Sequence, residues 1–281
     1  MIVLGVLFPQ FHSLATYIQY LLMLMLFFAF LDIDIQPQSF QKGVVWVVAA
    51  NIIVAFTAYG ILRPFDLNLA LAAFVTGIAP TAIATPVIIS FLHGQAEFAV
   101  GAVLLSNVVI ALILPVALPF VVGDVVQISV WQVLTPVLIT MFIPLILARI
   151  SKFLSRTVQS VIRRGRSFSF GIWLVALFSM CAKAADFLHN DVTASAATVL
   201  SIALVSLVIC IVNFAFGTLL GGERYRQESS QSLGQKNNSF VIWIALTFIN
   251  PLVALGPTFY ILYHNLYNSW QIYRFERDRN P

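Results

Sequence analysis

The sequence predicts an all-α integral membrane protein that crosses the bilayer several times. Hydrophobic residues make up 60% of its 281 residues, charged residues only 9%, and the mean hydropathy is +0.95. A soluble domain carries roughly 25% charged residues, so this chain lacks the charge to cover a water-facing surface and we expect lipid to be its main solvent. The apolar runs are continuous, whereas the strands of a membrane barrel would alternate in polarity.

Apolar segments separated by proline, glycine and charged residues predict an N-terminal half-helix followed by nine full transmembrane helices. The half-helix, 1–8, ends before Pro9 and at about 1.5 Å per residue reaches only about 12 Å, whereas a full span needs about 20 apolar residues. The nine expected spans are 14–31, 44–62, 67–92, 97–122, 130–148, 168–185, 193–219, 231–249 and 251–272. They make a single membrane domain of residues 1–281.

The distribution of basic residues predicts a cytoplasmic C-terminus. Six of the 15 Lys and Arg residues lie in one loop, 149–167, and Arg63 and Lys183 lie on the opposite side of the predicted spans. Six more share the side of the loop: Lys42, Arg224, Arg226, Arg274, Arg277 and Arg279. Cytoplasmic loops carry an excess of Lys and Arg. We therefore expect a multi-pass protein of a cell membrane, namely a bacterial inner membrane. The same bias accounts for the basic pI, so we expect no nucleic-acid partner. A lipid-binding role for the loop 149–167 is the less favoured alternative.

Two of the expected spans are interrupted. Span 67–92 contains Pro80 and Pro86 near its middle, and each proline removes a backbone donor and clashes with a preceding carbonyl. The other interruption is a polar run around Gly234 and Lys236 that continues into an apolar segment. Interrupted segments at corresponding positions in two halves indicate a transporter binding site, since half-helix ends and freed carbonyls can hold ions or anions. A proline kink without a transport role is the alternative for either break alone.

Five stretches resemble, in their order and spacing, those of a known family. They are Gly-Val-Leu-Phe-Pro at 5–9, Leu-Met-Leu-Met-Leu-Phe at 22–27, Ala-Pro-Thr-Ala-Ile-Ala-Thr-Pro at 79–86, Gly-Gln-Lys-Asn at 234–237, and the segment 251–266. The chain from about residue 4 to 269 resembles the bile acid:sodium symporter (BASS) family, whose members carry bile acids, pantoate and other organic anions. The second, third and fourth stretches stand where the family has LLMFLMGL, CPGGTASN and GMQN.

The resemblance implies both a fold and a function. The fold has two inverted repeats, here about 1–122 and 130–272, which form a panel domain and a core domain with two broken helices crossing in the core. The function is secondary active transport of a small organic anion by alternating access. The candidate substrate and ion site lies at the crossing and comprises Thr81, Thr85, Pro86, Asn107, Ser232, Gln235, Lys236 and Asn237, with Pro80 and Gly234 at the helix breaks.

The sequence departs from the family at the sodium ligands. The family holds two sodium ions with oxygen atoms at the crossing, but Thr85-Pro86 replaces its Ser-Asn pair. Ser232 replaces a glutamate and Lys236 replaces a glutamine. A hard cation needs a cage of oxygens, and an ammonium group would repel it. We therefore expect no sodium, no other metal and no cofactor, and we expect coupling to a proton or uniport.

Lys236 has two open interpretations. A charge within a span costs a few kcal/mol and persists only with a partner, with water or by snorkelling to the interface. In the first interpretation its ammonium takes the place of a lost sodium ion, compensates the crossing-helix carbonyls and attracts the anionic substrate. In the second, Lys236 lies near the cytoplasmic end of its helix and snorkels to the interface. Asn51, Ser106 and Asn213 have a similar ambiguity, since each could face the site or bond between helices.

Three other functions stay open from the sequence. The first is a sodium-coupled organic-anion symporter, and the second is an exchanger like the auxin efflux carriers, which share a related fold. The third is a membrane enzyme or a sensor. An enzyme would need convergent titratable groups or a metal cluster, and the predicted spans contain no such His, Asp and Glu set, so we expect no enzymatic activity.

Overall fold

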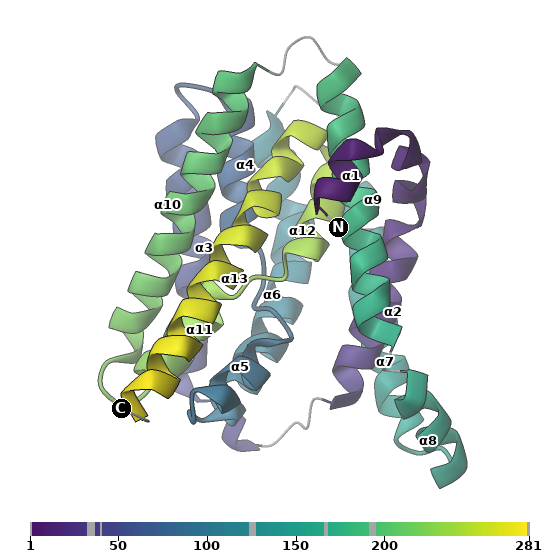
Figure 1. Cartoon of the computed structure of the whole chain (residues 1–281), viewed down its shortest axis with the longest axis vertical. Coiled ribbons are helices and arrows are strands. Elements are labelled where there is room, and N and C mark those ends of the chain that lie inside the picture. Colours follow the sequence, from purple (N-terminus) through teal and green to yellow (C-terminus); the bar gives the residue numbers. More distant parts are fainter. Residues whose placement is uncertain are drawn as a thin grey trace. The chain divides into compact units, whose positions relative to one another are not determined.

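The computed structural model describes residues 2–32, 37–39, 41–123, 128–165, 168–190 and 195–279, and these residues form helices without a β-strand. Six helical segments are long and apolar enough to cross a membrane (Figure 1). They are Pro9–Leu31, in which the 3-10 helix η1 (Pro9–Tyr17) leads into α2 (Ile18–Asp32), α3 (Lys42–Leu62), α6 (Ala96–Val122), α7 (Val130–Ser151), α9 (Ser169–Asn190) and α10 (Ala196–Gly221). The predicted all-α, multi-pass membrane fold is confirmed at this level.

Both predicted helix breaks are present. The expected span 67–92 consists of α4 (Leu67–Ile78) and α5 (Thr85–Phe91), and the chain between them is not helical. The other break separates α11 (Arg226–Gly234) from α12 (Asn238–Phe248). None of these four helices has the length of a span, and the total of nine crossings stays a prediction.

Three further helices differ in extent from the segments expected from sequence. α1 (Ile2–Leu7) forms the half-helix, α8 (Arg156–Gly165) lies within the expected basic loop, and α13 (Pro251–Arg279) extends past the expected end of its span. α8 places Val158 and Val161 among basic and polar residues at helical spacing, which is typical of an amphipathic surface helix. Residues 166 and 167 of the basic loop, and Thr193 at the expected start of the seventh span, lie outside the described residues.

The chain divides into two compact units, and each unit combines segments from both halves of the sequence. The first unit contains Met1–Asp34, Ala111–Ala194 and Ile242–Leu252, which include η1, α1, α2, α7, α8 and α9. The second contains Ile35–Ile110, Ser195–Val241 and Val253–Pro281, which include the short 3-10 helix η2 (Pro37–Ser39), α3, α4, α5, α10 and α11. α6 and α12 each contribute to both units, and α13 lies mainly in the second. Each unit therefore takes helices from both of the expected repeats, and the repeats themselves stay a prediction.

Within the first unit, α1 packs closely against α9. A Cβ atom on Gly5 would lie 2.6 Å from Cys181 Cβ and 2.8 Å from the Phe178 carbonyl oxygen, so this approach requires a glycine. α2 and α7 are joined by a hydrogen bond of 3.0 Å from Gln19 Nε2 to Thr140 Oγ1. Small residues and interhelical hydrogen bonds are the usual means by which helices associate in membranes.

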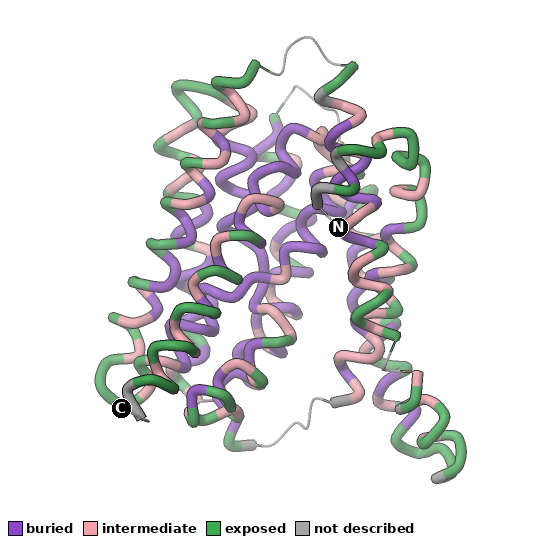
Figure 2. The backbone as a smooth tube through the Cα atoms, in the orientation of Figure 1, coloured by how far each residue is buried: buried purple, intermediate pink, exposed green. Residues whose placement is uncertain are grey.

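Within the second unit, α4 and the C-terminal part of α11 are deeply buried. Residues 70–78 of α4 and 228–234 of α11 are buried without exception, whereas α10 alternates between buried and exposed positions (Figure 2). The polar residues 228–232 of α11 are therefore enclosed by protein. Because buried polar groups need hydrogen-bond partners, this enclosure makes the second unit the place to look for a site.

Candidate functional site

The two broken helices meet at their interruptions and pair through the main chain. Ala82 N–H donates to the Gln235 carbonyl at 2.9 Å, and Asn237 N–H donates to the Pro80 carbonyl at 2.8 Å. Non-helical backbone at membrane depth is tolerated only where protein or water satisfies its polar groups. Each break therefore supplies a main-chain donor and a main-chain acceptor for the hydrogen bonds of the other break.

Thr81 lies opposite Lys236 in this antiparallel bridge and ties three further residues to it. Thr81 Oγ1 donates to the Ser232 carbonyl at 2.7 Å, and Thr81 N–H donates to Ser106 Oγ at 3.0 Å. The Thr81 carbonyl accepts a bond of 3.1 Å from Asn107 Nδ2. Four of the candidate residues predicted from sequence, Thr81, Asn107, Ser232 and Lys236, thus lie together, and Ser106 joins them.

Lys236 is 3% exposed and bonds to the end of α4. Its ammonium donates to the Gly77 carbonyl at 3.1 Å and to Asn51 Oδ1. Asn51 Nδ2 in turn donates to the carbonyls of Ile78 and Ala79, both at 3.1 Å. A helix C-terminus carries about half a negative charge, which a cation stabilises. The snorkelling interpretation is wrong for this structure, because Lys236 turns inward to a helix end.

The C-terminal end of α11 is satisfied by a residue that the sequence did not single out. Tyr260 on α13 donates its hydroxyl to the Gly234 carbonyl at 2.8 Å and accepts a bond of 3.2 Å from Asn213 Nδ2 on α10. Gly234 also meets α10 closely, since a Cβ atom there would overlap the Phe214 ring. The glycine therefore ends α11 and also lets it approach α10.

Three buried oxygens near the two breaks have no hydrogen-bond partner among the described residues. They are Asn107 Oδ1, Ser232 Oγ and Asn238 Oδ1. Asn238 begins α12 and was not predicted as a site residue. A buried polar atom without a partner is costly and needs an explanation such as a bound ligand, ion or water. These atoms can accept hydrogen bonds or coordinate a cation.

The remaining predicted residues are less central. Thr85 Oγ1 donates to the Ala82 carbonyl at 2.6 Å within its own break, and Pro86 lies in the first turn of α5. The Gln235 side-chain amide donates to Gln231 Oε1 at 3.1 Å, so the Gln235 side chain lies along α11. Asn237 takes part in the pairing of the two breaks through its main chain.

A buried carboxylate ties the start of α11 to the start of α6. Glu228 is 6% exposed, and its Oε1 accepts a bond of 2.8 Å from the Gln95 N–H, just before α6 begins. A carboxylate at such a position satisfies a donor that the helix leaves free. Glu228 falls in the loop expected between the spans 193–219 and 231–249, and no local pattern marks it as buried.

Replacing Tyr260 by phenylalanine is expected to lower the free energy of unfolding by about 1–2 kcal/mol, because the buried Gly234 carbonyl loses its donor. Thermal unfolding of the purified protein in detergent measures the change. Tyr263→Phe, on the same helix and lining its surface, serves as the matched control and should change stability by less than about 0.5 kcal/mol. Equal stability of the two variants would contradict the role assigned to Tyr260.

In the described part of the chain, no group of three or more His, Cys, Asp or Glu residues could hold a metal ion. No protein-family model matches the sequence, and no curated protein matches it. What the molecule does must therefore be inferred from the paired helix breaks themselves.

Proposed function

We propose that this protein is a secondary transporter that moves a small organic anion across a cell membrane by alternating access, in the manner of the BASS family. The observation that carries this proposal is the pairing of two buried, broken helices with a cationic side chain, Lys236, at the pair. Interrupted helices in the two halves of a membrane protein are characteristic of transporter binding sites. A buried positive charge at that place favours an anionic substrate.

The proposed architecture has nine spans in two inverted repeats, with a cytoplasmic C-terminus in a bacterial inner membrane. The mixed composition of the two units supports it, because each unit takes helices from both halves of the chain. Inverted repeats that each contribute to a panel and a core domain would produce that composition. The first unit would then be the panel domain and the second unit the core domain.

The proposed transport is independent of sodium. The carbonyl groups at the end of α4 accept hydrogen bonds from Lys236 and Asn51, and the Gly234 carbonyl accepts one from Tyr260. Helix-end carbonyls of this kind coordinate the coupling cation in transporters with broken helices. With protein donors in place, the modes that we propose are uniport and coupling to a proton carried by Lys236.

A sodium-coupled symporter is the second candidate, and one observation favours it. The oxygens of Asn107, Ser232 and Asn238 that lack partners in the described structure are hard ligands of the type that Na⁺ requires. The two candidates differ in a measurable way, because only the second needs a sodium gradient.

The first experiment is a thermal-shift screen of the purified protein against organic anions, from steroid carboxylates to pantoate, with Na⁺ or with K⁺ and at several pH values. A ligand of the folded state raises the unfolding temperature. The anion that gives the largest shift is then radiolabelled, and its uptake into proteoliposomes is measured with a sodium gradient, with a pH gradient and with neither.

We expect uptake that does not change when K⁺ replaces Na⁺ and that is lost in Lys236→Gln, while Lys42→Gln, at an exposed position on α3, transports normally. Strong stimulation by an inward sodium gradient, together with normal uptake by Lys236→Gln, would favour the second candidate. If no anion shifts the unfolding temperature and none is taken up, the proposal of an organic-anion transporter fails.

A further inference from the structure

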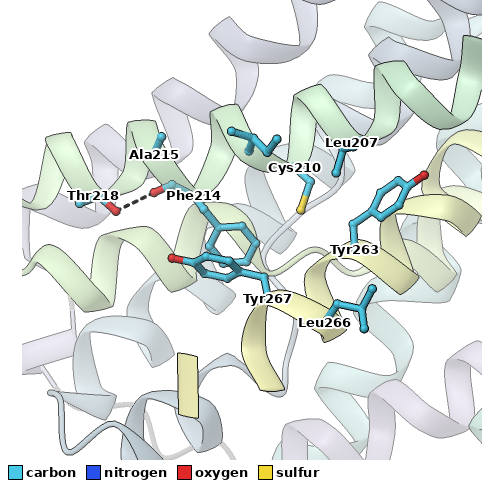
Figure 3. A pocket seen from close by; sticks show the side chains of 9 residues that line it. Leu207, Cys210, Phe214, Ala215, Thr218, Tyr263, Leu266 and Tyr267 are labelled. Carbon is cyan, nitrogen blue, oxygen red and sulfur yellow. Dashed lines mark hydrogen bonds between the residues drawn. The ribbon is translucent and has the colours of Figure 1, made fainter. Parts of the chain in front are cut away.

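An apolar groove lies between α10 and α13 on the second unit (Figure 3). Its volume is about 350 Å³, and its lining is Leu207, Cys210, Ile211, Phe214, Ala215, Thr218, Tyr263, Leu266 and Tyr267. The rings of Phe214 and Tyr267 lie against each other with centroids 4.1 Å apart. Ile211 and Leu266 are more than half exposed, so the groove opens along the outer face of these helices.

A polar, basic cavity adjoins the groove at the end where α11 begins. This cavity measures about 390 Å³ and is lined by Leu92, Thr218, Arg226, Gln227, Ser230, Tyr267, Trp270, Gln271, Arg274 and Phe275. Thr218 and Tyr267 line both spaces, so the two spaces adjoin each other along α10 and α13. The described lining carries two guanidinium groups and no carboxylate, and Arg274 lies over the Trp270 ring at 5.5 Å.

The length of the apolar groove fits the acyl chain of one lipid. From Leu207 to Thr218, at about 1.5 Å per residue, the apolar part follows α10 for about 16 Å. That is close to the depth of one leaflet in a hydrocarbon core about 30 Å thick. Trp270 sits beside the basic cavity, and tryptophan is enriched at the membrane–water interface. The basic end therefore corresponds to the headgroup region and the apolar end to the acyl chains.

We propose that the groove between α10 and α13 binds one acidic phospholipid, whose phosphate lies between Arg226 and Arg274 and whose acyl chain lies along Phe214 and Leu207. Arginine is well suited to phosphate oxygens because its planar group donates two parallel hydrogen bonds. The occupant has to be amphiphilic, since a soluble anion would leave the apolar part open, and two arginines in the lining favour a headgroup with a net negative charge. The site is independent of whether the protein transports an organic anion.

A second groove, on the other side of α10, provides an internal comparison. It lies between α3 and α10, has a volume of about 420 Å³, and contains Ala58 and Val208 in its lining. The described lining of this groove includes no basic residue. Lipid that contacts this second groove should show no preference for an acidic headgroup.

The test measures lipid binding to the delipidated full chain in detergent by native mass spectrometry. Phosphatidylglycerol and phosphatidylcholine with the same acyl chains are compared, and glycerol phosphate serves as a headgroup without a tail. We expect phosphatidylglycerol to bind about tenfold more tightly than phosphatidylcholine, since two arginines near a headgroup each favour an acidic lipid. Glycerol phosphate should not compete.

Four variants locate the site. Arg226→Gln with Arg274→Gln should remove the headgroup preference, while Arg224→Gln with Arg277→Gln changes net charge equally, lies outside the lining, and should keep it. Ala215→Phe, which fills the groove, should weaken the binding of both lipids. Ala58→Phe in the second groove should leave the preference for the acidic headgroup unchanged. Unfolding temperatures check that each variant is folded.

A measurement on the unaltered protein keeps the proposal testable if a variant does not fold. Phosphatidylglycerol with a photoreactive acyl chain should label the segment 207–218 of α10. Equal affinity for the two lipids, competition by glycerol phosphate, labelling elsewhere, or protection of the groove by a second copy of the chain would each overturn the proposal.

Discussion

Replacing Lys236 by methionine is expected to lower the free energy of unfolding by about 2–4 kcal/mol and to abolish transport. The variant leaves the Gly77 carbonyl and Asn51 Oδ1 buried without a donor, and each unsatisfied buried acceptor costs about 1–3 kcal/mol. Removal of a desolvated charge offsets part of this loss, since a buried ammonium is itself costly. The loss outweighs that gain because both acceptors stay buried at the C-terminal end of α4.

Thermal unfolding and proteoliposome uptake measure the two effects of Lys236→Met. Lys42→Met is the matched control, because Lys42 is exposed at the start of α3, the helix that carries Asn51. We expect its stability to stay within about 0.5 kcal/mol of the unaltered protein. A Lys236→Met protein that is as stable as the control and still transports would show that the ammonium has neither role.

A double-mutant cycle separates the two partners of the ammonium. Asn51→Leu removes one acceptor of Lys236 and also the donor to Ile78 and Ala79. Because the two side chains share one network, we expect the double variant to lose less stability than the sum of the single variants, by about 1–3 kcal/mol. Additive losses would mean that the contact between them contributes nothing.

Replacing Gly234 by alanine is expected to lower the free energy of unfolding by about 1–3 kcal/mol through overpacking. The added Cβ would overlap the Phe214 ring, so α11 and α10 would have to move apart. That movement would also stretch the bond from Tyr260 to the Gly234 carbonyl. Thermal unfolding measures the loss, and uptake should fall with it because the end of α11 forms one side of the crossing.

Two further variants test the cause of the Gly234→Ala effect. Phe214→Leu in the Gly234→Ala background removes the overlapping ring and should recover part of the lost stability, even though Phe214→Leu alone is destabilising. Gly60→Ala on α3 meets nothing within 4 Å and should be neutral or stabilising by up to about 1 kcal/mol, because alanine favours helix. If both glycine variants behave alike, the close packing of α11 on α10 is not the cause.

The helix breaks were predictable because their chemistry is local. Proline and glycine interrupt helices through their own backbone properties. Pro80 follows the end of α4, Pro86 lies in the first turn of α5, and Gly234 is the last residue of α11. The six long apolar helices were predictable for a similar reason, because the length of each apolar run and its few charges already indicate a helix that spans the bilayer. Exact bounds were less predictable, and α8 within the basic loop was not expected.

The partners of Lys236 could not be predicted, because they depend on contacts between distant parts of the chain. Asn51 lies 185 residues away in sequence, and no periodicity links the two. The polar run before Lys236 suggested an exposed helix end, yet Ser229 and Ser230 are buried. Their burial follows from Gly217 on α10, where an added Cβ would lie 2.6 Å from the Ser229 carbonyl oxygen. Tyr260 and Glu228 were missed for the same reason.

The pairing at the crossing has a consequence for how such proteins diverge. Ala82, Pro80, Gln235 and Asn237 are joined through main-chain atoms, which every residue type provides apart from the donor that proline lacks. Mutation can therefore exchange most side chains at this joint while the joint itself persists. Two related proteins can therefore lose sequence similarity at the paired breaks and still keep the same main-chain hydrogen bonds. Comparing those hydrogen bonds would then reveal the relationship after sequence comparison fails.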